Sequence, residues 1–284
     1  VYNQAIKILE TSKSNEKIPF IVFKFTGLIQ FKILNKISNK QELNSYEQKT
    51  YDLFLNRINL ICEKALKIKT PIFIDAEESW IQDAIDKIVL SLMKKYNQKE
   101  VLVYNTLQMY RNDRIAYLNK TITVAKNEKF KLGFKLVRGA YHEKEIARAK
   151  KNGYKTPVHL KKEDTDIDFN KSLEICISNI DIVSICSGTH NVESSEYLIS
   201  LMKEKGIKNN DKRIFSSQLL GMSDNISYNL SKEGYNVCKY VPYGPVKEVI
   251  PYLIRRAEEN RSISGQMSRE LQNIISERKR RKRA

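Results

Sequence analysis

Seven short runs of β-branched and aromatic residues alternate with longer amphipathic stretches along this 284-residue chain, and this alternation constrains its fold more than any other feature. A strand, a helix and a second strand in succession predict a parallel strand pair joined by a crossover helix. Repetition of that unit gives either an open doubly wound sheet or a closed (β/α)8 barrel. We therefore expect an α/β protein, with a length that suits one large domain or two small ones.

The expected strands lie at residues 18–25, 71–75, 101–105, 132–137, 182–186, 213–218 and 236–241. The expected helices lie at residues 80–96, 113–128, 141–152, 167–179, 194–205 and 224–233, with a longer helical insert at 40–67. Neither a GxGxxG fingerprint nor a P-loop is present, which removes the main support for the open sheet. Polar residues follow the predicted strands directly, where barrel enzymes carry their chemistry. We predict a TIM-type barrel whose first strand precedes residue 1, so that the chain is truncated at its N-terminus.

The net charge of +17 raises the hypothesis of a nucleic-acid or membrane-surface binding module. Six of the cations form the run RKRRKR at residues 278–283, and the other lysines alternate with acidic and amide residues. No DNA- or RNA-binding motif accompanies them. We expect a barrel domain at residues 1–277 and a basic, disordered tail at 278–284 that contacts anionic lipid or nucleic acid without specificity.

The cysteines and histidines argue against a metal centre. Four cysteines occur without a CxxC pair, and the three histidines lack HExxH spacing, so we expect no metal site and no disulfide framework. Reduced cysteines favour a cytosolic setting. We expect neither a signal peptide nor a membrane-spanning segment, because no apolar run approaches the roughly 20 residues that cross a bilayer.

Several strand-end residues are candidates for binding a small charged molecule. Lys24 interrupts the apolar run VFKFTG, and a buried lysine needs an anion; the alternative is a lysine that extends to solvent. Asp75 ends the run PIFID and either joins a site or caps the following helix. Arg255 and Arg256 can clamp a carboxylate, while Glu259 lies one turn after Arg255. The alternative for these three is a solvated helix with an ordinary ion pair.

Five segments, quoted in chain order, resemble the strand-end motifs of proline dehydrogenase. They read FIDAEESW, FKLVRGAYHEKE, SGTHN, QLLGMSDNI and KYVPYGPVKEVIPYLIRRAEEN. The resemblance covers residues 24–260, and the agreement of several motifs in order is more specific than any one of them. It implies a distorted (β/α)8 barrel whose last helix lies across the barrel mouth. It also implies FAD as cofactor, L-proline as substrate and a membrane quinone as electron acceptor, with contact at the periphery of a membrane. In a eukaryote it implies a mitochondrial location, and otherwise the cytoplasm or the inner membrane surface.

The resemblance also assigns roles to individual residues. The substrate site would comprise Lys24, Asp75, Tyr141, Leu219, Tyr240, Arg255, Arg256 and Glu259, with the arginines and Lys24 on the proline carboxylate. The FAD site would comprise Ala76, Gln108, Lys135, Val137, Gly139, Ala140, His142, Lys162, Thr189, His190 and Asn191. The implied reaction is hydride transfer from proline C5 to flavin N5, which yields Δ1-pyrroline-5-carboxylate.

Two residues depart from the family pattern. Lys135 stands where some members carry arginine near flavin N5, so the cation is kept but the bidentate fork is lost. His142 replaces an aromatic residue found in some members. A barrel enzyme without flavin that acts on a small carboxylate remains the alternative function, and a binding module for nucleic acid or membrane surfaces is the third.

Overall fold

The computed structural model describes residues 1–13, 15, 17–242, 244, 246–247, 249–250, 253–254, 275–276 and 278–281. Its contacts divide the chain into two compact units, Val1–Lys239 and Tyr240–Ala284. The α/β fold lies in the first unit, and its last strand ends on the first residue of the second. None of the helices within these described residues is long and apolar enough to cross a membrane.

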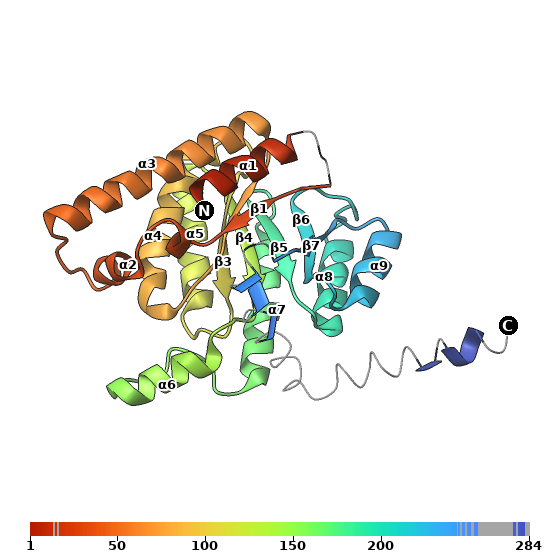
Figure 1. Cartoon of the computed structure of the whole chain (residues 1–284). Helices are drawn as coiled ribbons and strands as arrows, with labels where there is room; N and C mark the ends of the chain where they lie inside the picture. The colour runs from red at the N-terminus through yellow and green to blue at the C-terminus, as the bar shows by residue number, and fades with distance from the viewer. Residues whose placement is uncertain are drawn as a thin grey trace. The chain divides into compact units, whose positions relative to one another are not determined.

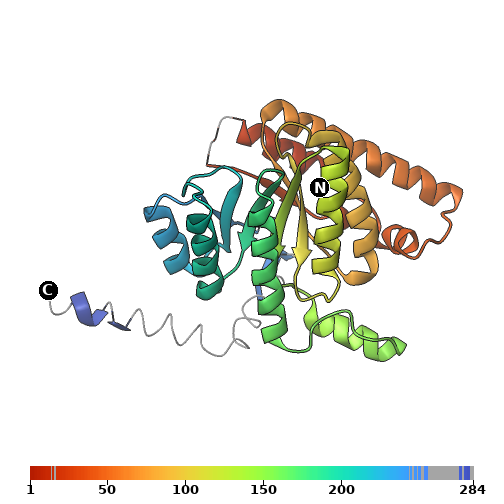
Figure 2. The same cartoon turned by 180° about the vertical axis from the view of Figure 1, so that it is seen from behind.

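Seven strands form one sheet in which the spatial order follows the chain order. They are β1 (Ile21–Phe23), β2 (Ile72–Ile74), β3 (Val103–Gln108), β4 (Leu132–Val137), β5 (Val183–Gly188), β6 (Ile214–Leu219) and β7 (Val237–Tyr240). The sheet is parallel and curls into a half-barrel with helices on its outer face (Figures 1 and 2). Since the order never reverses, the sheet has no topological switch point, which excludes the doubly wound alternative and confirms the barrel-type prediction.

The helices differ from the prediction mainly near the N-terminus. They are α1 (Tyr2–Ser12), the 3₁₀ turn η1 (Phe25–Gly27), α2 (Phe31–Ser38), α3 (Ser45–Ile68), α4 (Ser79–Tyr96), α5 (Arg114–Glu128), α6 (His142–Asn152), α7 (Lys162–Ser178), α8 (Val192–Glu204) and α9 (Asp224–Lys232). The predicted strand at 18–25 was too long, because the chain turns into η1 directly after Lys24. The insert predicted at 40–67 begins only at Ser45, where Asn44 and Glu47 form a reciprocal capping box.

Apolar side chains fill both faces of the curled sheet. Ile72 and Ile74 belong to the large cluster between the sheet and the helices. Phe73, between them, belongs to a separate cluster with Tyr104 and Cys186, which therefore lies on the concave face. Phe20 stacks on Phe73 there with ring centroids 4.1 Å apart. This aromatic cluster fills the interior of the half-barrel, so the polar residues nearer the carboxyl ends of the strands have an apolar floor.

Candidate active site

A buried ion pair joins β4 to the end of β2. Lys135 Nζ donates to Asp75 Oδ1 over 2.7 Å, and the two residues are only 7% and 8% exposed. The ammonium also lies 5.8 Å from the centroid of the Phe73 ring in the aromatic cluster below. The alternative role of Asp75 as a helix cap is wrong, because Glu78 occupies the N-cap position of α4. Burial of both charges instead makes Asp75 part of a polar site.

A second cation lies at the end of β1. Lys24 Nζ donates to Tyr141 Oη over 2.9 Å. Burial works against the charge on Lys24, but Tyr141, Asp75 and Glu77 outweigh it and raise the lysine's pKa. Burial raises the pKa of Tyr141 as well. At neutral pH Lys24 is therefore a cation and Tyr141 keeps its proton.

Gln108, the last residue of β3, connects the loop after β2 with the turn after β4. Its Nε2 donates to the Glu77 carbonyl over 2.8 Å, and its Oε1 accepts from the Ala140 amide over 3.0 Å. Between Val137 at the end of β4 and Ala140 lies Gly139, with a φ of +142° that L side chains rarely adopt. A Cβ there would lie 2.5 Å from the Tyr110 ring. This turn therefore requires glycine.

Arg138 organises the neighbouring ends of β4 and β5. Its Nη1 donates to Thr189 Oγ1 over 2.6 Å, its Nη2 donates to Ser194 Oγ over 2.9 Å, and its Nε pairs with Asp166 Oδ1 over 2.5 Å. Lys162, in the first turn of α7, binds the other oxygen of Asp166 over 2.5 Å. The predicted cofactor residue Thr189 thus binds the Arg138 guanidinium directly, and Lys162 is connected to it through Asp166. The resemblance did not assign Arg138 to the site.

The two predicted cofactor histidines differ in surroundings. His190 Nδ1 lies 3.0 Å from Ser223 Oγ, and burial, with Lys239 and Arg138 nearby, lowers the pKa of His190 to about 4. It is therefore neutral at neutral pH. His142 Nε2 lies 2.8 Å from the His159 carbonyl. Asn191 caps α8, because its Oδ1 accepts from the Ser194 amide over 2.6 Å.

The remaining predicted residues fall into two groups. Ala76 follows β2 and Leu219 ends β6, and both are 8% exposed. Tyr240 ends β7 and belongs to the second compact unit. Arg255, Arg256 and Glu259 lie outside the described residues. Within the described part of the chain, no group of three or more His, Cys, Asp or Glu side chains is arranged to hold a metal ion.

Comparison with known families identifies the fold's relatives. A family model described as proline dehydrogenase matches residues 1–269. The chain belongs to the proline dehydrogenase family. This confirms the resemblance of the five motifs. The "Proline dehydrogenase 1, mitochondrial" proteins of Drosophila melanogaster and Homo sapiens are 38% and 36% identical over 83% and 84% of this chain. The chain spans only 36% and 40% of the lengths of those two relatives.

A solved structure of the family's fold supports the barrel assignment. Proline utilization A (PutA) from Bdellovibrio bacteriovorus, inactivated by N-propargylglycine, superimposes with a TM-score of 0.79. The match covers 91% of this chain and 28% of that one at 17% sequence identity, so it bears on the fold alone.

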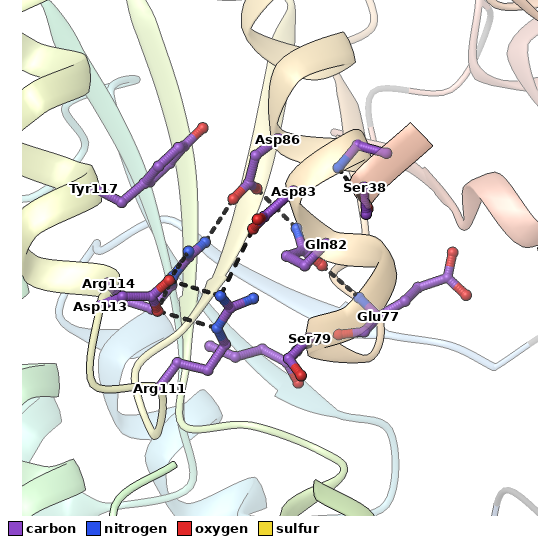
Figure 3. A network of polar contacts seen from close by, with 12 residues as sticks. Ser38, Glu77, Ser79, Gln82, Asp83, Asp86, Arg111, Asp113, Arg114 and Tyr117 are labelled. Atoms are coloured by element: carbon purple, nitrogen blue, oxygen red, sulfur yellow. Dashed lines mark hydrogen bonds and ion pairs between the residues drawn. The ribbon is translucent and has the colours of Figure 1, made fainter. Parts of the chain in front are cut away.

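A buried polar network next to the loop that carries Asp75 was not predicted from the sequence (Figure 3). Asp86 on α4 pairs with Arg114 on α5 over 2.6 Å, and both residues are buried. Glu77, after β2, accepts from the amide and the hydroxyl of Thr26 in η1 over 3.1 and 2.5 Å. One indication of this network is present in the sequence, namely the carboxylate of Glu77 in DAEES, two residues after Asp75.

Proposed function

We propose that this protein oxidises L-proline to Δ1-pyrroline-5-carboxylate with FAD as cofactor. The observation that carries the proposal is the position of Lys24 and Asp75 directly after β1 and β2, with Asp75 paired to Lys135 on β4, in a chain of the proline dehydrogenase family. A zwitterionic amino acid presents one carboxylate and one amine, and cations beside a carboxylate complement both charges.

For the carboxylate half of the substrate, the proposal assigns Lys24, Arg255 and Arg256. The raised pKa of Lys24 keeps its ammonium charged, as a carboxylate partner must be. Two adjacent arginines add bidentate, charge-assisted hydrogen bonds. Glu259 would orient the arginines and the substrate amine, and Asp75 would orient the surrounding side chains. Tyr141, Leu219 and Tyr240 would form the apolar wall against the pyrrolidine ring.

The residues that the structure describes fit a flavin. Thr106 Oγ1 is buried without a hydrogen-bond partner among the described atoms, and Thr106 is the β3 partner of Lys135 in the sheet register. The two side chains therefore share the concave face, where one offers a polar atom and the other a cation. The glycine turn at Gly139 permits close approach to the backbone. The proposed FAD contacts are Ala76, Gln108, Lys135, Val137, Gly139, Ala140, His142, Lys162, Thr189, His190 and Asn191.

When bound, FAD would supply the hydride acceptor at N5 for the C5 hydrogen of proline and would pass the electrons to a membrane quinone. Lys135 contributes a fixed positive charge that stabilises negative charge developing beside it. Since Lys24 remains charged and Tyr141 protonated at neutral pH, neither takes a proton from the amine. Because hydride transfer needs the lone pair of a neutral amine, proline has to release its ammonium proton to solvent on binding. The protein's main work is then to orient the neutral amine and its C–H bond and to exclude water.

We propose that the protein works at the surface of a membrane. A quinone acceptor implies contact at the periphery of a membrane, and relatives named as mitochondrial support a mitochondrial location if the source is eukaryotic. The basic run at residues 278–283 would assist binding to anionic lipid. We also propose that the catalytic region ends at residue 277, where this tail begins.

A visible absorption spectrum tests the proposal directly. The full chain is reconstituted with FAD, freed of excess cofactor and mixed with L-proline without oxygen. We expect a flavin band that L-proline bleaches and that pyrrolidine, which lacks the carboxylate, bleaches far more slowly. A protein that stays colourless after reconstitution, or a flavin band that L-proline leaves unchanged, would overturn the proposal and favour a barrel enzyme without flavin.

A further inference from the structure

Five polar residues form a hydrogen-bonded series next to the candidate site, and four of them, Arg114, Asp86, Gln82 and Glu77, are labelled in Figure 3. Arg114 Nη1 binds Asp86 Oδ2, and Asp86 Oδ1 accepts from Gln82 Nε2 over 2.8 Å. Gln82 Oε1 then accepts from the Glu77 amide over 2.8 Å. The Glu77 carboxylate finally holds Thr26. The series therefore runs from α5 through α4 to the loops that follow β2 and β1.

Its last two members lie beside proposed substrate residues. Thr26 is two residues after Lys24, and Glu77 is two residues after Asp75. The Glu77 carbonyl also accepts from Gln108, which in turn binds the Ala140 amide. Displacement of the Glu77 backbone would therefore move the loop that carries Asp75 and release the turn that carries Lys24.

The buried ion pair of Asp86 and Arg114 holds this series in one geometry. Asp86 Oδ1 also accepts from Asn105 Nδ2 over 2.9 Å, so its carboxylate meets three donors. Burial opposes the charge on Arg114, but Asp86 and Asp113 outweigh it and raise the pKa of Arg114. In a buried, low-dielectric environment a satisfied network fixes one geometry, and loss of one acceptor leaves its donors unpaired.

We propose that Asp86 and Arg114 are positioning residues which, through Gln82, Glu77 and Thr26, fix Lys24 for the substrate carboxylate. The inference rests on the proposed proline oxidation. Neither Asp86 nor Arg114 touches substrate in this arrangement. Their effect is transmitted through a chain of hydrogen bonds and appears as a change in where the Lys24 ammonium lies.

The test compares Asp86→Asn with Asp83→Asn in the full chain. Asp83 is on the same helix, but its side chain is 69% exposed and its carboxylate reaches Arg111 only at 3.9 Å. We expect Asp86→Asn to raise the KM for L-proline about threefold to tenfold, with Asp83→Asn unchanged. In a double-mutant cycle, Asp86→Asn should have no further effect on KM once Lys24→Ala is present. Additive effects, or equal KM values for the two asparagine variants, would overturn the inference.

A second readout does not depend on turnover. The rate at which an acylating reagent modifies the Lys24 amine, followed by mass spectrometry, should rise severalfold in Asp86→Asn and stay at the wild-type value in Asp83→Asn. If proline does not reduce the flavin of the wild-type protein, the proposed function fails. The labelling rates still test whether Asp86 positions Lys24. If Asp86→Asn does not fold, Thr26→Val should increase labelling while Thr26→Ser, which keeps the hydroxyl, should not. Equal labelling in that pair would refute the inference.

Discussion

Lys135 and Asp75 are sixty residues apart in the chain and form a buried ion pair at 2.7 Å across the concave face of the sheet. Strand β3 lies between the strand of Lys135 and the strand that precedes Asp75, so the pair spans an intervening strand. Curvature of the half-barrel brings the two side chains together, because carboxyl ends of parallel strands converge at one mouth. A pair of buried charges at such a position is a common arrangement in functional sites.

Replacement of Lys135 by methionine should separate electrostatics from packing. It removes the donor from a buried carboxylate, which should cost about 1–3 kcal/mol of folding stability in urea unfolding. The proline-dependent rate of flavin reduction should fall by about one to two orders of magnitude, as expected for loss of a fixed charge beside the reacting centre. Lys135→Arg keeps the charge and serves as control. Equal rates for the methionine and arginine variants would show that the cation has no role in the reaction.

The carboxylate clamp lies on residues that the structure does not describe, and kinetics can test it. Arg255→Ala and Arg256→Ala should each raise the KM for L-proline about 10- to 100-fold, the equivalent of a charge-assisted hydrogen bond. Initial rates of flavin reduction over a wide range of proline concentration provide the measurement. An unchanged KM in both variants would contradict the clamp.

The strand ends could be predicted from sequence because each requires only local information. An apolar run marks the strand, and the next polar residue marks its carboxyl end, so Lys24 and Asp75 lie directly after β1 and β2 as expected. The third strand was predicted to end at residue 105, but β3 continues to Gln108. The pair of Asp86 and Arg114 had no such signal. Each is a charged residue within an amphipathic helix, and such residues usually face solvent. Only the packing of α4 against β3 and the rotation of each helix about its axis determine that these two face inward, and neither follows from spacing.

Gly139 offers a test of backbone strain at the site. Gly139→Ala adds a Cβ 2.5 Å from the Tyr110 ring and holds alanine at a φ of +142°, so we expect a loss of about 2–5 kcal/mol in folding stability. Gly153→Ala is the matched control, because its φ is +69° but no atom lies within 4 Å of the added Cβ. That control should lose only about 1–2 kcal/mol. Similar unfolding midpoints for the two variants would show that the contact with Tyr110 relaxes freely.

His190 should make folding stability depend on pH in a defined window. Its pKa is about 4 in the folded protein and about 6.5 when exposed, so between these values the unfolded state binds more protons. Stability is therefore fully present above about pH 6.5 and decreases as the pH falls towards 4, by roughly 1–3 kcal/mol in total. Urea unfolding of wild type and His190→Asn at intervals from pH 4.5 to 7.5 measures the effect. Because asparagine does not titrate, the free energy of unfolding of the variant should fall less with decreasing pH than that of the wild type. Parallel curves for the two proteins would show that burial of a neutral His190 does not cause the pH dependence.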